Sequence, residues 1–176
     1  MVTSAEGGPI VIVDYDPRWP RMFEEERARI LAATRPHVVA VEHIGSTAVP
    51  GLAAKPIIDL LAGVRRLEDA RACIAPLAAL GYDYVPEFEA ELPDRRYFRK
   101  GSGAAHTNHI HMVEVDGPFW RRHLAFRDDL RTHPEDVRRY ADLKRDLAAK
   151  FGADRAGYTD AKTAFIREIE ARALAR

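Results

Sequence analysis

The sequence lacks several features that would place it in a specialised class of protein. Its 176 residues contain one cysteine, Cys73, so no intrachain disulfide can form and a reducing compartment is expected. The apolar stretch around Cys73 favours a buried, inert thiol over a nucleophile. No window approaches the roughly 18 apolar residues of a membrane-spanning helix, and the N-terminus has no basic segment before a long apolar run. We therefore expect a cytoplasmic protein without a membrane partner.

A large charge of either sign is also lacking, because 27 basic residues balance 27 acidic ones. Residues 1–116 carry 13 basic and 17 acidic side chains, a net charge of −4, and residues 117–176 carry 14 and 10, a net charge of +4. A protein dedicated to nucleic acid would show a strongly basic stripe, so extended nucleic acid is not an expected partner. The charge balance still allows a binding site with a locally basic wall for a small anionic ligand. Nothing in the sequence indicates the oligomeric state.

The predicted elements indicate one domain over residues 1–176, strand-rich at 10–115 and helical at 117–175. Apolar runs and alternation predict strands at 10–14, 37–44, 56–64, 82–88, 95–101 and 106–115. Helical spacing predicts helices at 18–33, 67–80 with a break at Pro76, 118–133, 134–151 and 160–175. The second and third strands are apolar on both faces, which predicts central positions in the sheet. This order favours an α+β fold, a mixed β-sheet with flanking helices and a C-terminal helical cover.

The stretch HIGSTAVPGLAAKPIIDLL holds the main candidate site. Gly45 has no Cβ, and the hydroxyl groups of Ser46 and Thr47 can donate to phosphate oxygens. Lys55 adds a mobile positive charge, and Asp59 on the next strand could hold Mg²⁺ against the same phosphates. A structural turn, with Asp59 salt-bridged to Lys55 or an arginine, is the alternative. Because a carboxylate without a partner is unstable in an apolar core, its place within IIDLL favours a functional site.

The strand at 106–115 carries a second polar constellation. Strand alternation places His109 and His111 on one face. Two such imidazoles can ligate one metal ion or flank one substrate, and hydrogen bonding within the sheet is equally compatible with them. No further cysteine and no HExxH motif completes a zinc site.

Basic residues of the C-terminal helices are weaker candidates. Arg127 and Arg131 lie four residues apart on one helix, so they could reach a phosphate or pair with Asp128 and other surface acids. The surface pairing is favoured, and Arg127 is kept as a candidate phosphate ligand. Lys144 and Lys162 are expected to lie in solvent unless the fold turns them inward.

Five segments together resemble the GrpB family. The motifs YDPRWPRMFEEE, HIGSTAVPGLAAKPIIDLL, NHIHMVE, FWRRHLAFRDDLR followed by HP, and YTDAKTAFI occur in the family's order, and the resemblance covers residues 11–169. The family is similar to the nucleotidyltransferase superfamily of the polymerase-β kind, and in some proteins it is joined to dephospho-coenzyme A kinase. The resemblance implies a nucleotidyltransferase-like fold.

The superfamily's signature is an apolar residue, Gly, and Gly or Ser, followed after a gap by Asp, an apolar residue and Asp or Glu. Here IGS is followed after twelve residues by DLL, so Asp59 matches the first acid and Leu61 stands in place of the second. Two carboxylates hold the metal ions of such enzymes. One carboxylate cannot chelate in that way, although imidazole can bind Mn²⁺ or Zn²⁺ and can act as a base.

Two functions of different classes follow. The first is a divergent nucleotidyltransferase that moves a nucleoside monophosphate onto a small acceptor. The phosphates would lie against the Gly-Ser-Thr turn and Lys55, Asp59 would bind Mg²⁺ or Mn²⁺, and His109 or His111 would act as a base or second metal ligand. The alternative is a non-catalytic accessory domain that binds a nucleotide or another small phosphorylated ligand.

Overall fold

The computed structural model describes residues 8–102 and 105–176. Its strands, in chain order, are β1 (Val38–Ile44), β2 (Ile58–Val64), β3 (Tyr82–Tyr84), β4 (Arg96–Ser102) and β5 (Ala105–Glu114). Its α-helices are α1 (Trp19–Thr34), α2 (Ile74–Ala79), α3 (Pro118–Thr132), α4 (Pro134–Phe151), α5 (Arg155–Ala161) and α6 (Thr163–Leu174). Short 3₁₀ helices cover Ser46–Ala48, Leu67–Cys73 and Pro86–Glu89. No helix within these ranges is long and apolar enough to cross a membrane.

The strands form a mixed sheet in the order β1-β2-β5-β4-β3. The central pair, β2 and β5, is parallel, and the other neighbours are antiparallel. The α+β fold with a mixed sheet and flanking helices is thus confirmed. The predicted central position is right for β2 but wrong for β1, which lies at an edge. Helices on both of its faces, α1 and α3, account for the apolar residues that suggested a central strand.

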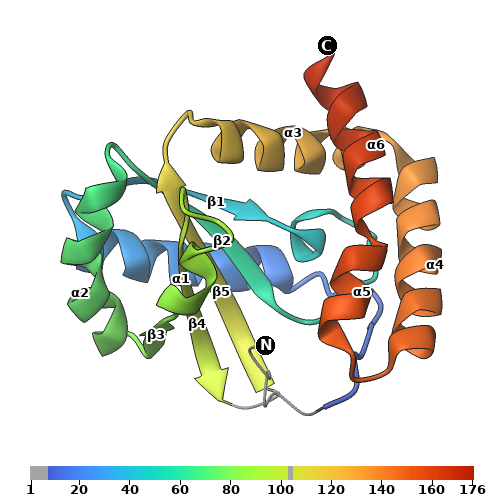
Figure 1. The fold of residues 1–176 in the computed structure, drawn as a ribbon, viewed down its shortest axis with the longest axis horizontal. Coiled ribbons are helices and arrows are strands. Elements are labelled where there is room, and N and C mark those ends of the chain that lie inside the picture. The colour runs from blue at the N-terminus through green and yellow to red at the C-terminus, as the bar shows by residue number, and fades with distance from the viewer. Residues whose placement is uncertain (1–7, 103–104) are drawn as a thin grey trace.

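Alternate residues of β2 enter two different cores. Ile58, Leu60 and Ala62 pack in a large core with residues of α1 and α2. Leu61, on the opposite face, packs in a smaller core that includes Trp120 of α3. A separate core joins α3, α4 and α6 to the loop that follows the first 3₁₀ helix. Figure 1 shows α4 and α6 together as a cover beside the sheet, as the sequence predicts.

Several local predictions need correction. Residues 10–14 form no strand but a single bridge between Val13 and Ala54. The segment 82–88 is extended only to Tyr84, because the 3₁₀ helix then begins at Pro86, which has no backbone donor for a sheet. The segment 160–175 divides between α5 and α6 at Lys162. The expected break near Pro76 is a change from 3₁₀ to α-helix after Cys73, whose thiol is buried as predicted.

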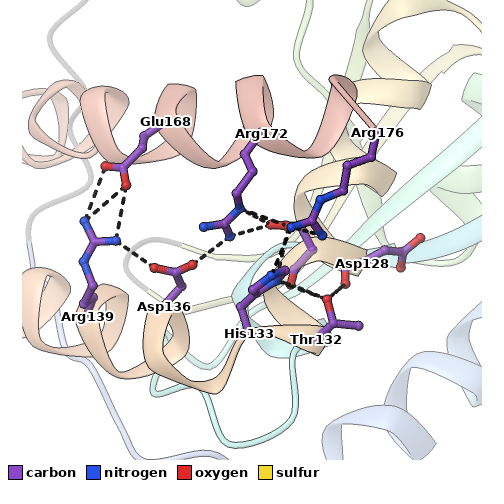
Figure 2. A network of polar contacts seen from close by, with 9 residues as sticks. Asp128, Thr132, His133, Asp136, Arg139, Glu168, Arg172 and Arg176 are labelled. Carbon is purple, nitrogen blue, oxygen red and sulfur yellow. Dashed lines mark hydrogen bonds and ion pairs between the residues drawn. The ribbon is translucent and has the colours of Figure 1, made fainter.

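A network of buried charges fastens α6 to α3 and α4 (Figure 2). Arg172 of α6 lies 2.7 Å from Asp136 of α4, and its Nε lies 2.9 Å from the carboxylate of Asp129 in α3. The two carboxylates are only 2–3% exposed. Arg139 of α4 adds contacts to Asp136 and to Glu168 of α6. This network fastens the C-terminal half of α6 to α3 and α4.

Candidate functional site

The site is built on the strand ends around Asp59. Asp59 is the second residue of β2 and lies opposite Ile44 of β1 and His109 of β5. Gly45 follows directly after β1 with φ +71°. A Cβ at this position would lie 2.6 Å from Oδ2 of Asp59. Glycine is therefore needed here twice, for its backbone conformation and for the close approach of the carboxylate.

Two imidazoles face the Asp59 carboxylate. Nδ1 of His109 lies 3.3 Å from Oδ1 of Asp59, and Nε2 of His111 lies 3.5 Å from the same oxygen. The predicted face of β5 is thus the one that meets Asp59, whose side chain is 27% exposed. Burial alone would raise the pKa of Asp59, but hydrogen bonds from His109 and His111 outweigh it and hold the pKa below its usual value. The carboxylate is therefore ionised.

The tautomer of His111 follows from its second partner. Nη1 of Arg95 lies 3.1 Å from Nδ1 of His111, and a guanidinium has only donors. Nδ1 must accept, so the proton is on Nε2 and points toward Asp59. Burial lowers the pKa of His111 against the attraction of Asp59, which agrees with a neutral ring. In His109, Nε2 is buried and has no hydrogen-bond partner among the described residues.

The Gly-Ser-Thr turn is held by its own hydrogen bonds. The hydroxyl of Thr47 donates to the carbonyl of Ile57 at 3.0 Å, so it accepts from Nε2 of His43, also at 3.0 Å. Burial lowers the pKa of His43 to about 4, so this ring is neutral. Ser46 forms a side-chain hydrogen bond with Tyr140 of α4. The single hydroxyl proton of Thr47 is therefore engaged within the protein.

A small cavity of about 120 Å³ opens beside Asp59. Its walls come from the turn, both central strands and the C-terminal helices: Ser46, Thr47, Lys55, Ile57, Asp59, His109, Lys144, Tyr158 and Lys162. We call it the lysine cavity, because three of these residues are lysines. Asp59 is the one carboxylate among them. The sequence prediction that Lys55 and Asp59 meet at one place is consistent with this geometry, but Lys144 and Lys162 were wrongly expected in solvent.

Lys144 of α4 and Lys162, which lies between α5 and α6, are both strongly perturbed by their surroundings. Lys144 is 2% exposed, donates to the carbonyl of Ala53 and lies 4.5 Å from the ring centre of Tyr140. Burial, and then the charge of Lys162, lowers the pKa of Lys144 to about 7. Burial, and then Lys55, lowers the pKa of Lys162 to about 8, with Asp59 opposing the change. Both amines are therefore held where a negative charge would stabilise them.

A larger cavity of about 530 Å³ adjoins the lysine cavity. The two share Ser46, Asp59, His109 and Lys162. The remaining walls of this second space, the aromatic cavity, are largely aromatic or imidazole rings: Phe88, Tyr97, His111, His123, Phe126 and Tyr140. Arg95 and Glu170 also line it. Together the two cavities offer a cationic compartment joined to a ring-lined one.

Arg127 is placed away from both cavities. Its guanidinium bonds to Glu42 of β1 at 2.7 Å, to Asp128 at 2.7 Å and to the carbonyl of His43 at 3.0 Å. These contacts use Nε and Nη1 of the guanidinium, and those of Nη1 join α3 to β1. The observed arrangement matches the pairing with Asp128 that the sequence favoured, so the candidate role of Arg127 in binding phosphate has no support from its position.

The position of the missing acid is closed to a metal ion. Leu61 is fully buried and packs with Ile44, Val113 and Trp120 under α3. Within residues 8–102 and 105–176, no group of three or more His, Cys, Asp or Glu side chains is arranged to hold a metal ion. The two imidazoles that were predicted as ligands instead turn toward one oxygen of Asp59. The donor set therefore does not fit the superfamily's two-metal arrangement.

The fold and site define an α+β protein with a lysine cavity beside the start of β2 and the middle of β5, and comparisons place it in a family. The family model described as "GrpB protein" matches residues 9–172, so the chain belongs to the GrpB family. A crystal structure of the conserved protein GrpB from Enterococcus faecalis is 40% identical, with a TM-score of 0.84 over 94% of this chain and 98% of that one. This membership is consistent with the superfamily kinship that the sequence resemblance implies.

Curated relatives agree with this membership. The UPF0157 protein YqkA of Bacillus subtilis is 40% identical over 92% of this chain, which spans 46% of YqkA. The glutamate-rich protein GrpB of Alkalihalophilus pseudofirmus is 32% identical over 92% of this chain and 94% of that protein. A dephospho-CoA kinase of Mycolicibacterium paratuberculosis is 30% identical over 94% of this chain and 46% of its own length.

Proposed function

We propose that this GrpB protein binds a nucleotide or a similar small phosphorylated ligand, with a phosphate group in the lysine cavity. The observation that carries the proposal is the meeting of three lysines with a single carboxylate in a space of about 120 Å³. Two of these amines are so poorly solvated that burial lowers the pKa of Lys144 to about 7 and that of Lys162 to about 8. A bound phosphate would supply the missing negative charge and raise both pKa values.

The aromatic cavity supports a ligand with a ring system. Its rings surround a space of about 530 Å³, which is a common size for small-molecule sites. A nucleobase can stack on such rings while its phosphate reaches the shared residues, Asp59 and Lys162. The dephospho-CoA kinase among the relatives carries the name of a phosphorylated, adenine-containing substrate. Dephospho-CoA therefore belongs among the ligands to be tested.

Nucleotidyl transfer is a second candidate, favoured by the geometry of His109. Its Nδ1 faces Asp59, and its Nε2 is buried at the cavities without a partner. An ionised Asp59 would orient the ring, and Nε2 could take the proton of an acceptor hydroxyl as that oxygen bonds to the α-phosphorus and pyrophosphate leaves. Mg²⁺ or Mn²⁺ would arrive with the phosphates, since the described residues do not supply the two-carboxylate set.

Calorimetric titration of the whole chain with AMP, ATP and dephospho-CoA, each with and without Mg²⁺ or Mn²⁺, tests the proposal. We expect at least one ligand to bind, and Lys162→Gln to weaken its binding at least tenfold through the loss of a charge-assisted contact. Lys150→Gln, the same change at an exposed position of α4, is the matched control and should bind like the wild type. Failure of every ligand to bind, or equal binding by Lys162→Gln, would contradict the proposal.

Asp59→Asn separates binding from transfer. If Asp59 only shapes the site, the variant binds the ligand and the wild type releases no pyrophosphate from ATP with any acceptor. If transfer occurs, the wild type releases pyrophosphate and the variant does not. Binding that depends on Mg²⁺ or Mn²⁺ and is lost in the variant would assign the metal contact to Asp59.

A further inference from the structure

Arg95 is a half-buried cation that the proposed phosphate site does not use. It precedes β4, and it lines the aromatic cavity but not the lysine cavity. Its guanidinium lies 4.9 Å from the ring centre of Tyr97 and donates to Nδ1 of His111. The His111 ring separates it from Asp59, which lies at the other nitrogen, Nε2. Arg95 is therefore a positive centre apart from the three lysines.

Arg95 forms no ion pair within the described part of the chain. No carboxylate lies within ion-pair distance of its guanidinium there, and its Nε is buried without a hydrogen-bond partner. Neighbouring arginines differ: Arg96 pairs with Glu89, and Arg122 pairs with Glu170. Burial lowers the pKa of Arg95, with Tyr97 and Glu91 opposing the change. A half-buried guanidinium with an unused Nε donor beside a cavity is suited to an anionic group of a ligand.

The geometry points to a second anion-binding position at Arg95, so that the ligand carries two separate anionic groups. One group is the phosphate in the lysine cavity, and for this group the inference rests on the proposed function. The second group, a phosphate or a carboxylate, accepts hydrogen bonds from Arg95 in the aromatic cavity. The ligand's ring system lies between them, against Tyr97 and the other rings that line this space. His111 is then a positioning residue, since its neutral ring anchors Arg95.

The test compares three probes by calorimetric titration of the whole chain: adenosine 5′-monophosphate, adenosine 3′,5′-bisphosphate, and adenosine 5′-monophosphate with a 3′-O-succinyl group. We expect at least one of the doubly anionic probes to bind roughly tenfold more tightly than the monophosphate, the effect of one charge-assisted hydrogen bond. The doubly anionic probe that binds more tightly than the monophosphate identifies the second group as a phosphate or a carboxylate. Equal affinity for all three probes would overturn the inference while leaving the lysine cavity in place.

Substitutions test whether Arg95 causes the tighter binding of the doubly anionic probe. Arg95→Gln should abolish the preference for the doubly anionic probe, and Arg95→Lys should restore part of that preference. Arg96→Gln is the matched control, since Arg96 lines a separate small cavity with Ala70, Arg71 and Ile74 and should keep the full preference. A preference that survives Arg95→Gln would overturn the inference. Failure of every probe to bind would remove the proposed function as well.

Discussion

The buried amine of Lys144 makes the folded chain less stable at neutral pH than it would be without that charge. Its pKa falls from 10.5 to about 7 on folding, and the side chain is 2% exposed. Between these two pKa values the unfolded chain binds more protons than the folded one, so the free energy of unfolding rises with pH in this window. The cost of burying the amine is about 4 kcal/mol at pH 7 and about 2 kcal/mol at pH 9.

Lys144→Met removes this cost and keeps an unbranched side chain of similar length. The substitution also removes the hydrogen bond to the carbonyl of Ala53 and the contact with the ring of Tyr140. The lost hydrogen bond of the neutral amine leaves a buried carbonyl unpaired, which offsets the gain by about 2 kcal/mol at any pH. We therefore expect the variant to be about 2 kcal/mol more stable than the wild type at pH 7 and nearly equal to it at pH 9.

Urea unfolding followed by circular dichroism at pH 7, 8 and 9 measures this difference. Lys150→Met, which removes an exposed lysine of the same helix, should show no comparable change with pH. The reasoning would be refuted if Lys144→Met were less stable than the wild type by the same amount at every pH. That result would mean that the contacts of the amine, and not its desolvation, dominate. The stabilised variant should also bind the phosphorylated ligand more weakly.

Two further substitutions test how the site is held. Arg172→Met removes the cation shared by two buried carboxylates of α3 and α4, and it should lower the free energy of unfolding by about 2–4 kcal/mol in urea, whereas exposed Arg167→Met should change it little. Gly45→Ala forces a Cβ to within 2.6 Å of the Asp59 carboxylate and should abolish ligand binding in titration. Gly51→Ala is the control, because Gly51 also has a positive φ but has open space where a Cβ would lie. This variant should lose stability and keep binding. Equal binding by both variants would contradict the role of Gly45.

Local sequence patterns were sufficient to predict most helices and strands. They also identified three residues of the candidate site, Asp59, His109 and His111. The apolar runs of β2 and β5 and the helical periodicity of α3 and α4 reflect short-range side-chain spacing, and these elements lie where the patterns predict. The alternation along β5 correctly placed His109 and His111 on one face. Asp59 stood out because a charge among isoleucines and leucines needs a partner. The substitution of Leu61 for an acid was readable without any structure.

The remainder depends on contacts between residues distant in sequence. Lys144 and Lys162 have the local pattern of exposed helical lysines, and only the packing of the C-terminal helices over the strand ends turns both amines into the cavity with Lys55. Nothing in the sequence indicated a role for Arg95 either, because its partner, His111, lies on a separate strand, β5. Arg127 shows the same dependence, since Glu42 of β1 meets its guanidinium only after the sheet and α3 have packed together. The sequence by itself determined the elements and the carboxylate at the centre of the site. Tertiary structure decided which cations surround it, because burial and charge pairing are properties of the folded arrangement.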